Sequence, residues 1–157
     1  MAYKIFISYS TKNLHIVDWA YRTLAKAGAV EVFAAEYSVT PGQALNEEIL
    51  QAIQRCDLFV LLWSHDAHDS AYVQQEIGAA VNARKAILPV VMEPNLPVPG
   101  FIADLKYLPA YMDWDGSFRW LAEFVSAKAA KQQDQQKMVA LLLTLIGGIW
   151  LFGQGGD

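Results

Sequence analysis

Short apolar runs recur along most of the chain and are separated by longer segments with a helical pattern. The most pronounced run is Leu58–Trp63, which is apolar throughout and is followed by the polar residues Ser64, His65 and Asp66. A run of this length between polar residues is typical of a strand that is buried on both faces of a parallel sheet. Shorter runs predict four further strands, at residues 5–7, 30–34, 86–92 and 108–112.

Between the strands, apolar residues recur at intervals of three and four, which predicts helices. The first helix is expected over residues 13–27 with Gly28 as its stop, the second ends before Asp57, the third begins near Ala71, and the last covers 117–131. The apolar residues at this helical spacing are Leu14, Val17, Tyr21, Leu24, Leu45, Ile49, Ile53, Phe118, Leu121, Phe124 and Val125. Alternating strands and helices predict an α/β fold, a flavodoxin-like three-layer sandwich with a central, mostly parallel five-stranded sheet.

Two prolines refine this outline. The connection over residues 35–42 is long for a strand-to-helix connection, and Pro41-Gly42 marks a turn within it. Pro89 lies inside the fourth predicted strand. Because proline cannot donate a hydrogen bond to a neighbouring strand, it argues for an edge position or a local bulge.

The C-terminal part of the chain changes character twice. Residues 131–137 form a polar linker, whereas residues 138–152 carry no charge and one hydroxyl group, on Thr144. As a helix up to Gly153, the apolar segment would be roughly 24 Å long, short of the roughly 30 Å hydrocarbon core of a bilayer. It is apolar all round, so it does not have the pattern of an amphipathic surface helix.

Two interpretations of this segment are open, namely a membrane anchor and a hydrophobic helix buried in an oligomer. Lysines precede the segment and Asp157 follows it, which by the positive-inside rule would leave the N-terminal domain in the cytoplasm. We expect a tail anchored in the inner membrane. The chain then divides into a folded domain at 1–130, the linker at 131–137 and the hydrophobic C-terminal segment at 138–153.

Composition and charge exclude several classes of function. The net charge of −4 and the pI near 5.3 provide no basic face for nucleic acid. A single cysteine, Cys56, excludes an internal disulfide and fits a reducing cytosol. His65 and His68 lie close together, but two histidines without a matching third ligand make a poor metal site. We therefore expect no metal.

The third predicted helix carries the candidate chemistry. It follows the central strand, and open α/β sheets bind ligands at the carboxyl ends of such strands. Asp69 or Ser70 can cap this helix, and Tyr72 and Glu76 share one face of it because they lie four residues apart. A glutamate on a helix is most often solvent-exposed, so this spacing alone does not assign Glu76 a role.

Three segments together resemble a TIR (Toll/interleukin-1 receptor) domain of the bacterial type, over residues 3–128. Residues 5–10, with the sequence Ile-Phe-Ile-Ser-Tyr-Ser, resemble the first conserved box of that family. Residues 32–45 resemble its second strand and the following BB loop. Residues 70–78 are similar to the segment that carries the catalytic glutamate in the members that cleave NAD+. Each motif alone is weak, but the three in this order are specific.

The resemblance implies roles for particular residues. Glu76 is the expected catalytic residue. The expected substrate-binding residues are Ser8, Tyr9, Ser10, Phe33, Tyr37 and Tyr72. NAD+ would be the substrate, and no cofactor is expected. Ala35 stands where the family often has aspartate, which removes one polar contact, and Tyr72 stands where many members have tryptophan, which keeps a flat stacking surface.

The function that the resemblance implies is an NAD+ glycohydrolase or cyclase of prokaryotic anti-phage immunity. It would release an ADP-ribose-derived signal, sensed by a downstream effector, or deplete NAD+. The domains are expected to associate with one another. One alternative is a TIR scaffold that signals by self-association without turnover. Another is an enzyme similar to nucleoside deoxyribosyltransferases, for which we identify no nucleobase pocket.

Overall fold

Five parallel strands form one central sheet in the computed structural model, which describes residues 1–34 and 46–152 and the side chains up to residue 145. The strands are β1 (Tyr3–Ser8), β2 (Val30–Ala34), β3 (Leu58–Trp63), β4 (Ile87–Val91) and β5 (Leu108–Pro109). Their order is β2-β1-β3-β4-β5, and every neighbouring pair is parallel. The predicted α/β fold with a parallel five-stranded sheet is confirmed.

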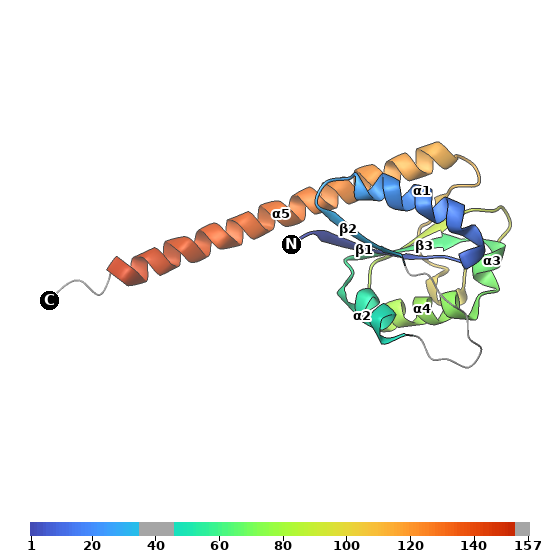
Figure 1. Ribbon diagram of the computed structural model, residues 1–157, viewed down its shortest axis with the longest axis horizontal. Helices are drawn as coiled ribbons and strands as arrows, with labels where there is room; N and C mark the ends of the chain where they lie inside the picture. The colour runs from blue at the N-terminus through green and yellow to red at the C-terminus, as the bar shows by residue number, and fades with distance from the viewer. Residues whose placement is uncertain (35–45, 153–157) are drawn as a thin grey trace.

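Helices cover both faces of the sheet, as Figure 1 shows. Within the described residues the helices are the 3₁₀ turn η1 (Thr11–Asn13), α1 (Leu14–Ala25), α2 (Glu47–Arg55), α3 (His65–His68), α4 (Ala71–Asn82), the 3₁₀ turn η2 (Gly100–Ile102) and α5 (Trp114–Phe152). Helix α1 and the first part of α5 pack on one face, and α2 and α4 pack on the other. The fold is therefore a three-layer sandwich.

Strand β3 is buried along its whole length because both of its faces are covered. Its alternate side chains Leu58, Val60 and Leu62 join the core under α1 and α5. Phe59 and Trp63 point the other way and join the core under α2 and α4, where Phe59 stacks on Phe6 with 5.4 Å between ring centroids. This two-sided burial is the reason why the run reads as continuously apolar.

The predicted start of the third helix is confirmed at Ser70. The Ser70 Oγ accepts a hydrogen bond from the backbone N–H of Val73 at 3.3 Å, and α4 begins at the next residue. Residues 65–68, for which the sequence pattern predicted no helix, form the short helix α3. The cause is a second cap, in which the Ser64 Oγ accepts from the Ala67 N–H at 3.1 Å.

Of the two interpretations of Pro89, an edge position or a local bulge, the edge position is wrong. Strand β4 pairs with β3 and with β5, so it is not an edge strand. Pro89 is nevertheless accommodated, because β5 pairs only with Val90 and Val91 and no neighbour on that side needs the missing N–H. Leu14 and Tyr21, at helical spacing in the first predicted helix, are 47% and 43% exposed.

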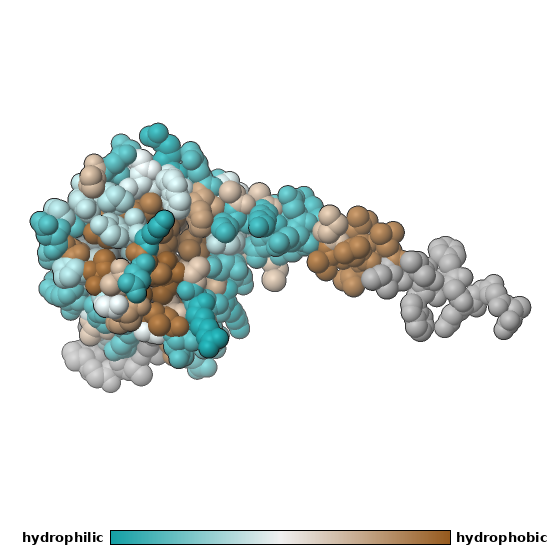
Figure 2. Space-filling model, turned by 180° about the vertical axis from the view of Figure 1, so that it is seen from behind, coloured by the Kyte–Doolittle hydropathy of each residue, from teal (hydrophilic) through white to brown (hydrophobic). Residues whose placement is uncertain are grey.

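Helix α5 differs most from its prediction. It runs without a break from Trp114 to Phe152, so the predicted linker at 131–137 is helical. Its first part is buried under the sheet, and its later part projects away from the domain (Figure 1). The projecting part is first hydrophilic and then apolar (Figure 2).

The membrane anchor predicted at residues 138–153 is not borne out. In the part of the chain that the structure describes, no helix is long and apolar enough to cross a membrane. The physical reason is length, because the uncharged stretch at 138–152 is roughly 22 Å long as a helix and a hydrocarbon core is roughly 30 Å thick.

The two parts of α5 predict effects of different size when leucine is replaced by alanine. Leu121 is fully buried, so Leu121→Ala should lower the free energy of unfolding by about 2–5 kcal/mol. Leu141 is 56% exposed in the single chain, so in the monomer Leu141→Ala should change it by less than about 0.5 kcal/mol. Urea unfolding followed by circular dichroism measures both values. Equal effects of the two substitutions would contradict the burial pattern.

Candidate active site

The candidate site lies where the carboxyl ends of β1 and β3 meet. These strands are neighbours in the sheet, but the chain leaves β1 toward β2 on one side and leaves β3 toward β4 on the other. Such a reversal of strand order separates the following connections and makes a crevice in which open α/β sheets bind ligands. Two parts of the chain meet at this edge. One is Ser8, the last residue of β1, and the other is α4, the helix that comes after β3 and the short α3.

Ser8 and Glu76 are joined directly at this edge. The Ser8 hydroxyl donates a hydrogen bond to Oε2 of Glu76 across 2.5 Å, although the two residues are 68 positions apart in the chain. Both side chains are fully buried. Their neighbours on this face of the sheet are apolar, among them Val73 and Ile77 of α4 and Phe6 of β1. Glu76 therefore lies in the core, whereas a glutamate on a helix is usually exposed to solvent.

Burial changes the chemistry of Glu76. Removal from water penalises the charged carboxylate and raises the pKa of Glu76 from 4.5 to about 8, while the hydrogen bond from Ser8 lowers it. Oε1 of the same carboxyl group is buried and has no hydrogen-bond partner among the described residues. An orphan buried oxygen costs free energy, so it marks a position where a ligand hydroxyl group would be stabilised.

Polar contacts tie the segment after β1 to the segment after β3. The Ser64 hydroxyl donates to Oδ1 of Asn13 at 2.8 Å, and the Lys12 ammonium lies 3.3 Å from the Asp66 carboxylate. Ser10 accepts a hydrogen bond from the Lys12 N–H and caps η1. Ser10 therefore satisfies the backbone of a turn here, and its predicted contact with substrate stays a prediction.

The other predicted substrate-binding residues are divided between the two faces of the sheet. Tyr9 points to the face opposite Ser8, because side chains alternate along the chain, and it lines a cavity of about 280 Å³ beside α1. Phe33 lies on the same face as Glu76, stacked on Phe6, and lines another pocket beside α2. Tyr72 is half-buried on α4, and Tyr37 lies outside the described residues.

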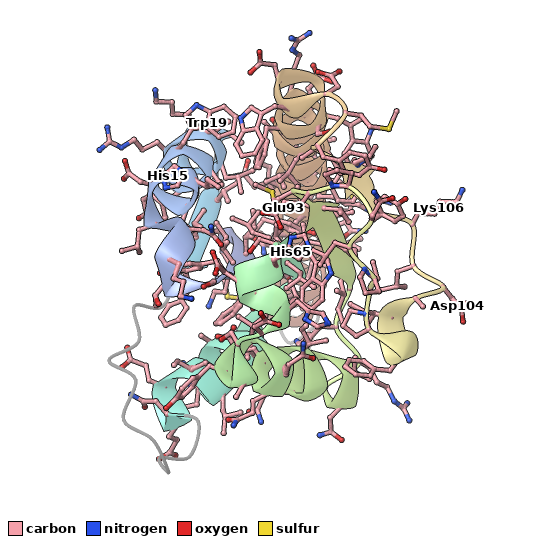
Figure 3. All side chains as sticks on the ribbon, turned by 90° about the vertical axis from the view of Figure 1, so that its right-hand side faces the viewer. His15, Trp19, His65, Glu93, Asp104 and Lys106 are labelled. Atoms are coloured by element: carbon pink, nitrogen blue, oxygen red, sulfur yellow. The ribbon has the colours of Figure 1, made fainter. Side chains whose placement is uncertain are left out.

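One contact between two side chains at this edge, His65 and Glu93, was missed by sequence reasoning. His65 and Glu93 lie side by side (Figure 3), and Oε2 of Glu93 accepts the backbone N–H of His65 at 2.7 Å and contacts its ring. Glu93 also lines a cavity of about 230 Å³ with Asn95, Tyr107 and others. Its position just after the fourth strand was a usable signal, since polar residues that follow parallel strands gather at one edge.

No group of three or more metal-ligating side chains occurs in the described part of the chain. The arrangement that remains is a carboxyl group buried among apolar side chains, with one oxygen hydrogen-bonded to Ser8 and the other without a partner among the described residues. When ionised, such a group can accept hydrogen bonds from a polyol and stabilise a neighbouring positive charge. When protonated, it can only serve as a neutral donor and acceptor.

The raised pKa of Glu76 predicts a characteristic dependence of stability on pH. Between the unfolded value of 4.5 and the folded value of about 8, the folded state binds the proton and the unfolded state does not. Stability from this group is therefore lost as pH rises, by roughly 3–4 kcal/mol between pH 5 and pH 8. Glu76→Gln keeps the volume of the side chain but has no group that titrates. The free energy of unfolding of the variant should therefore rise relative to that of the wild type by this amount between pH 5 and pH 8.

Urea unfolding at several pH values measures this difference. Glu123→Gln makes the same chemical change at an exposed position of α5 and should show no such trend. If Glu76→Gln and the wild type lose stability in parallel between pH 5 and pH 8, Glu76 does not bind its proton in the way that this burial implies.

Comparisons with known proteins show what the whole chain is similar to. The chain is 31% identical to a protein of Brachypodium distachyon named as a probable 2′ cyclic ADP-D-ribose synthase, over 87% of this chain and 70% of that protein. Among solved structures, the TIR domain of the Toll-related receptor TRR-2 from Hydra magnipapillata superposes with a TM-score of 0.62 at 22% identity, over 77% of this chain and 96% of that one.

The TIR domains of the activated Roq1 resistosome give a TM-score of 0.52 at 18% identity, over 92% of this chain and 99% of that one. At these identities the two structures show the fold alone. The family is shown by a sequence model described as TIR domain, which matches residues 5–122. On this match, which spans most of the chain, the protein belongs to the TIR domain family.

Proposed function

We propose that this protein cleaves the bond between nicotinamide and ribose in NAD+, with Glu76 as the catalytic residue. The observation that carries the proposal is the buried Glu76 carboxyl group, which has one oxygen held by Ser8 and the other without a partner. Its place where the strand order reverses is where such folds bind ligands. The relative named as a cyclic ADP-ribose synthase supports the choice of NAD+ as substrate.

The reaction needs charge stabilisation more than acid catalysis. In NAD+ the nicotinamide ring carries a positive charge. It departs as a neutral molecule because it takes the electron pair of the broken C–N bond. The ribose that remains develops positive charge at its anomeric carbon, as in other glycosidic cleavages. A carboxylate beside that carbon stabilises the transition state electrostatically, and its free oxygen can accept a ribose hydroxyl group.

The acceptor decides the product. Attack by water gives ADP-ribose and releases one proton, whereas attack by a hydroxyl or ring nitrogen of the same molecule gives a cyclic product and also releases one proton. We include both outcomes in the proposed activity. The motifs of bacterial type support a role in prokaryotic anti-phage immunity, in which the product signals to an effector or NAD+ is depleted.

Self-association is the second part of the proposal, and the exposed end of α5 favours it. Six apolar side chains between residues 138 and 145 are 50–64% exposed, namely Met138, Val139, Leu141, Leu142, Leu143 and Leu145. They form the brown section of the projecting helix in Figure 2. A helix that is apolar all round is normally buried, so we propose that copies of this chain cover one another here. A scaffold without turnover would show this association but no cleavage.

Substitution of the carboxyl group tests the catalytic proposal. Glu76→Gln should lower the rate of NAD+ cleavage at least about a hundredfold, because it removes the charge that stabilises the transition state. Purified protein is incubated with NAD+, and the products are resolved by mass. Glu123→Gln, an exposed site on α5, is the matched control and should retain activity. Wild-type turnover in a folded Glu76→Gln variant would exclude Glu76 as the catalytic residue.

A charge placed on the apolar section of α5 tests the association. Leu143 is 64% exposed, and Leu143→Arg should shift the protein toward monomers and lower its specific activity. Gln135→Arg adds the same charge in the polar part of the helix and should leave the assembly intact. Sedimentation velocity at several concentrations measures both. An assembly that survives Leu143→Arg unchanged would show that this section is not the interface.

A further inference from the structure

The hydroxyl group of Ser8 is fully committed in the structure. Ser8 has no exposed surface, and its hydrogen is donated to Oε2 of Glu76 across 2.5 Å. A serine hydroxyl carries one hydrogen, so while this bond is made it cannot also donate to a ligand. This arrangement differs from a direct contact with substrate, which the family resemblance suggests for Ser8.

The two groups are held by different and rigid parts of the fold. Ser8 ends β1, which is paired on both sides, and it lies opposite Leu61 of β3 in the sheet register. Glu76 lies one turn after Tyr72 on α4, and Val73 and Ile77 of that helix are fully buried against the same face of the sheet. The hydrogen bond therefore spans from the sheet layer to the helix layer and fixes the carboxyl plane between them.

We infer that Ser8 is a positioning residue for Glu76, which holds Oε2 so that Oε1 is the oxygen that meets the ribose. The inference rests on the proposed NAD+ cleavage. Ser8 acts through Glu76 and does not bind the substrate itself. The orphan state of Oε1 agrees with this division, because the described surroundings provide a partner for one carboxyl oxygen and leave the other for a ligand.

The same bond also supports the charged form of Glu76. Burial raises the pKa of Glu76, and the hydrogen bond donated by Ser8 lowers it. Burial is the larger of these two causes, so the net shift within the described residues is upward. The titratable groups on the surrounding elements are Tyr3 and Lys4 on β1, Tyr9 after it, Lys12 on η1, Glu47, Glu48 and Arg55 on α2, His65, Asp66 and His68 on α3, and Tyr72 on α4 itself. None of them is among the causes of the shift.

The pH profile of kcat/KM distinguishes positioning from substrate binding. In the wild type, kcat/KM should rise with pH as Glu76 ionises, with a midpoint near the pKa of about 8 of the free enzyme. Ser8→Ala removes the donor, so the acid limb should move to higher pH and kcat/KM below the midpoint should fall about tenfold. At high pH, where Glu76 is ionised in both proteins, a smaller loss of kcat should remain because the carboxyl group is no longer held, with KM unchanged.

Conservative variants test whether the donated hydrogen is the cause. Ser8→Thr keeps the hydroxyl group and should restore the wild-type profile, and Ser8→Cys keeps the size with a weaker donor and should lie between Ser and Ala. Ser117→Ala removes a buried hydroxyl in α5 and should leave the profile in place. A raised KM in Ser8→Ala at every pH, with the acid limb unmoved, would overturn the inference and make Ser8 a substrate contact.

A second measurement does not depend on activity. The ¹³C resonance of the Glu76 carboxyl carbon, assigned by its loss in Glu76→Gln, is titrated in the wild type and in Ser8→Ala, or in Ser8→Cys if the alanine variant does not fold. We expect the titration to move to higher pH in the variant. If the titration of the Glu76 carboxyl group has the same midpoint in the variant as in the wild type, Ser8 does not donate a hydrogen bond to it. A wild type that shows the carboxyl titration but does not cleave NAD+ would refute the proposed function instead.

Discussion

Burial of the Glu76 carboxyl group between a parallel sheet and α4 opposes the normal ionisation of a glutamate, and the rest of the site follows from that constraint. A fully buried carboxylate loses its hydration, so its pKa rises to about 8 unless other groups compensate. The described surroundings provide one hydrogen bond, from Ser8, and leave Oε1 unpaired. A group held in this state gains more from a ligand hydroxyl than an exposed carboxylate would, because water does not already satisfy it.

The fold buries this carboxyl group by covering both faces of the sheet. With α1 and α5 on one face and α2 and α4 on the other, every side chain of β3 is buried, and so is the end of β1. Alternation along β1 then separates Ser8 from Tyr9, so that only the serine lies on the face of α4. The contacts Ser64–Asn13 and Lys12–Asp66 link the connection after β1 to the connection after β3 at the same edge of the sheet.

The sequence predicted those features that depend on local pattern. Strands 30–34 and 58–63 were placed at their observed bounds, because apolar runs between polar residues are local signals, and Ser70 was recognised as a cap for the same reason. The Ser8–Glu76 bond could not be predicted from spacing, since its partners are 68 residues apart. The burial of Glu76 could not be predicted either, because the spacing of apolar residues along one helix does not show which side chains a neighbouring layer covers.

Helix α5 shows why composition alone misplaced a boundary. The polar stretch at 131–137 was predicted as a linker, yet glutamine and lysine are good helix formers and the stretch contains no glycine or proline, so the helix continues through it. The consequence is mechanical. A flexible linker would let the domain turn freely relative to the apolar section, whereas a continuous helix fixes the distance between them. If the apolar sections of several chains pack together, as proposed, the attached sites are therefore held at a defined spacing, and an assembly can set which surfaces of neighbouring domains meet.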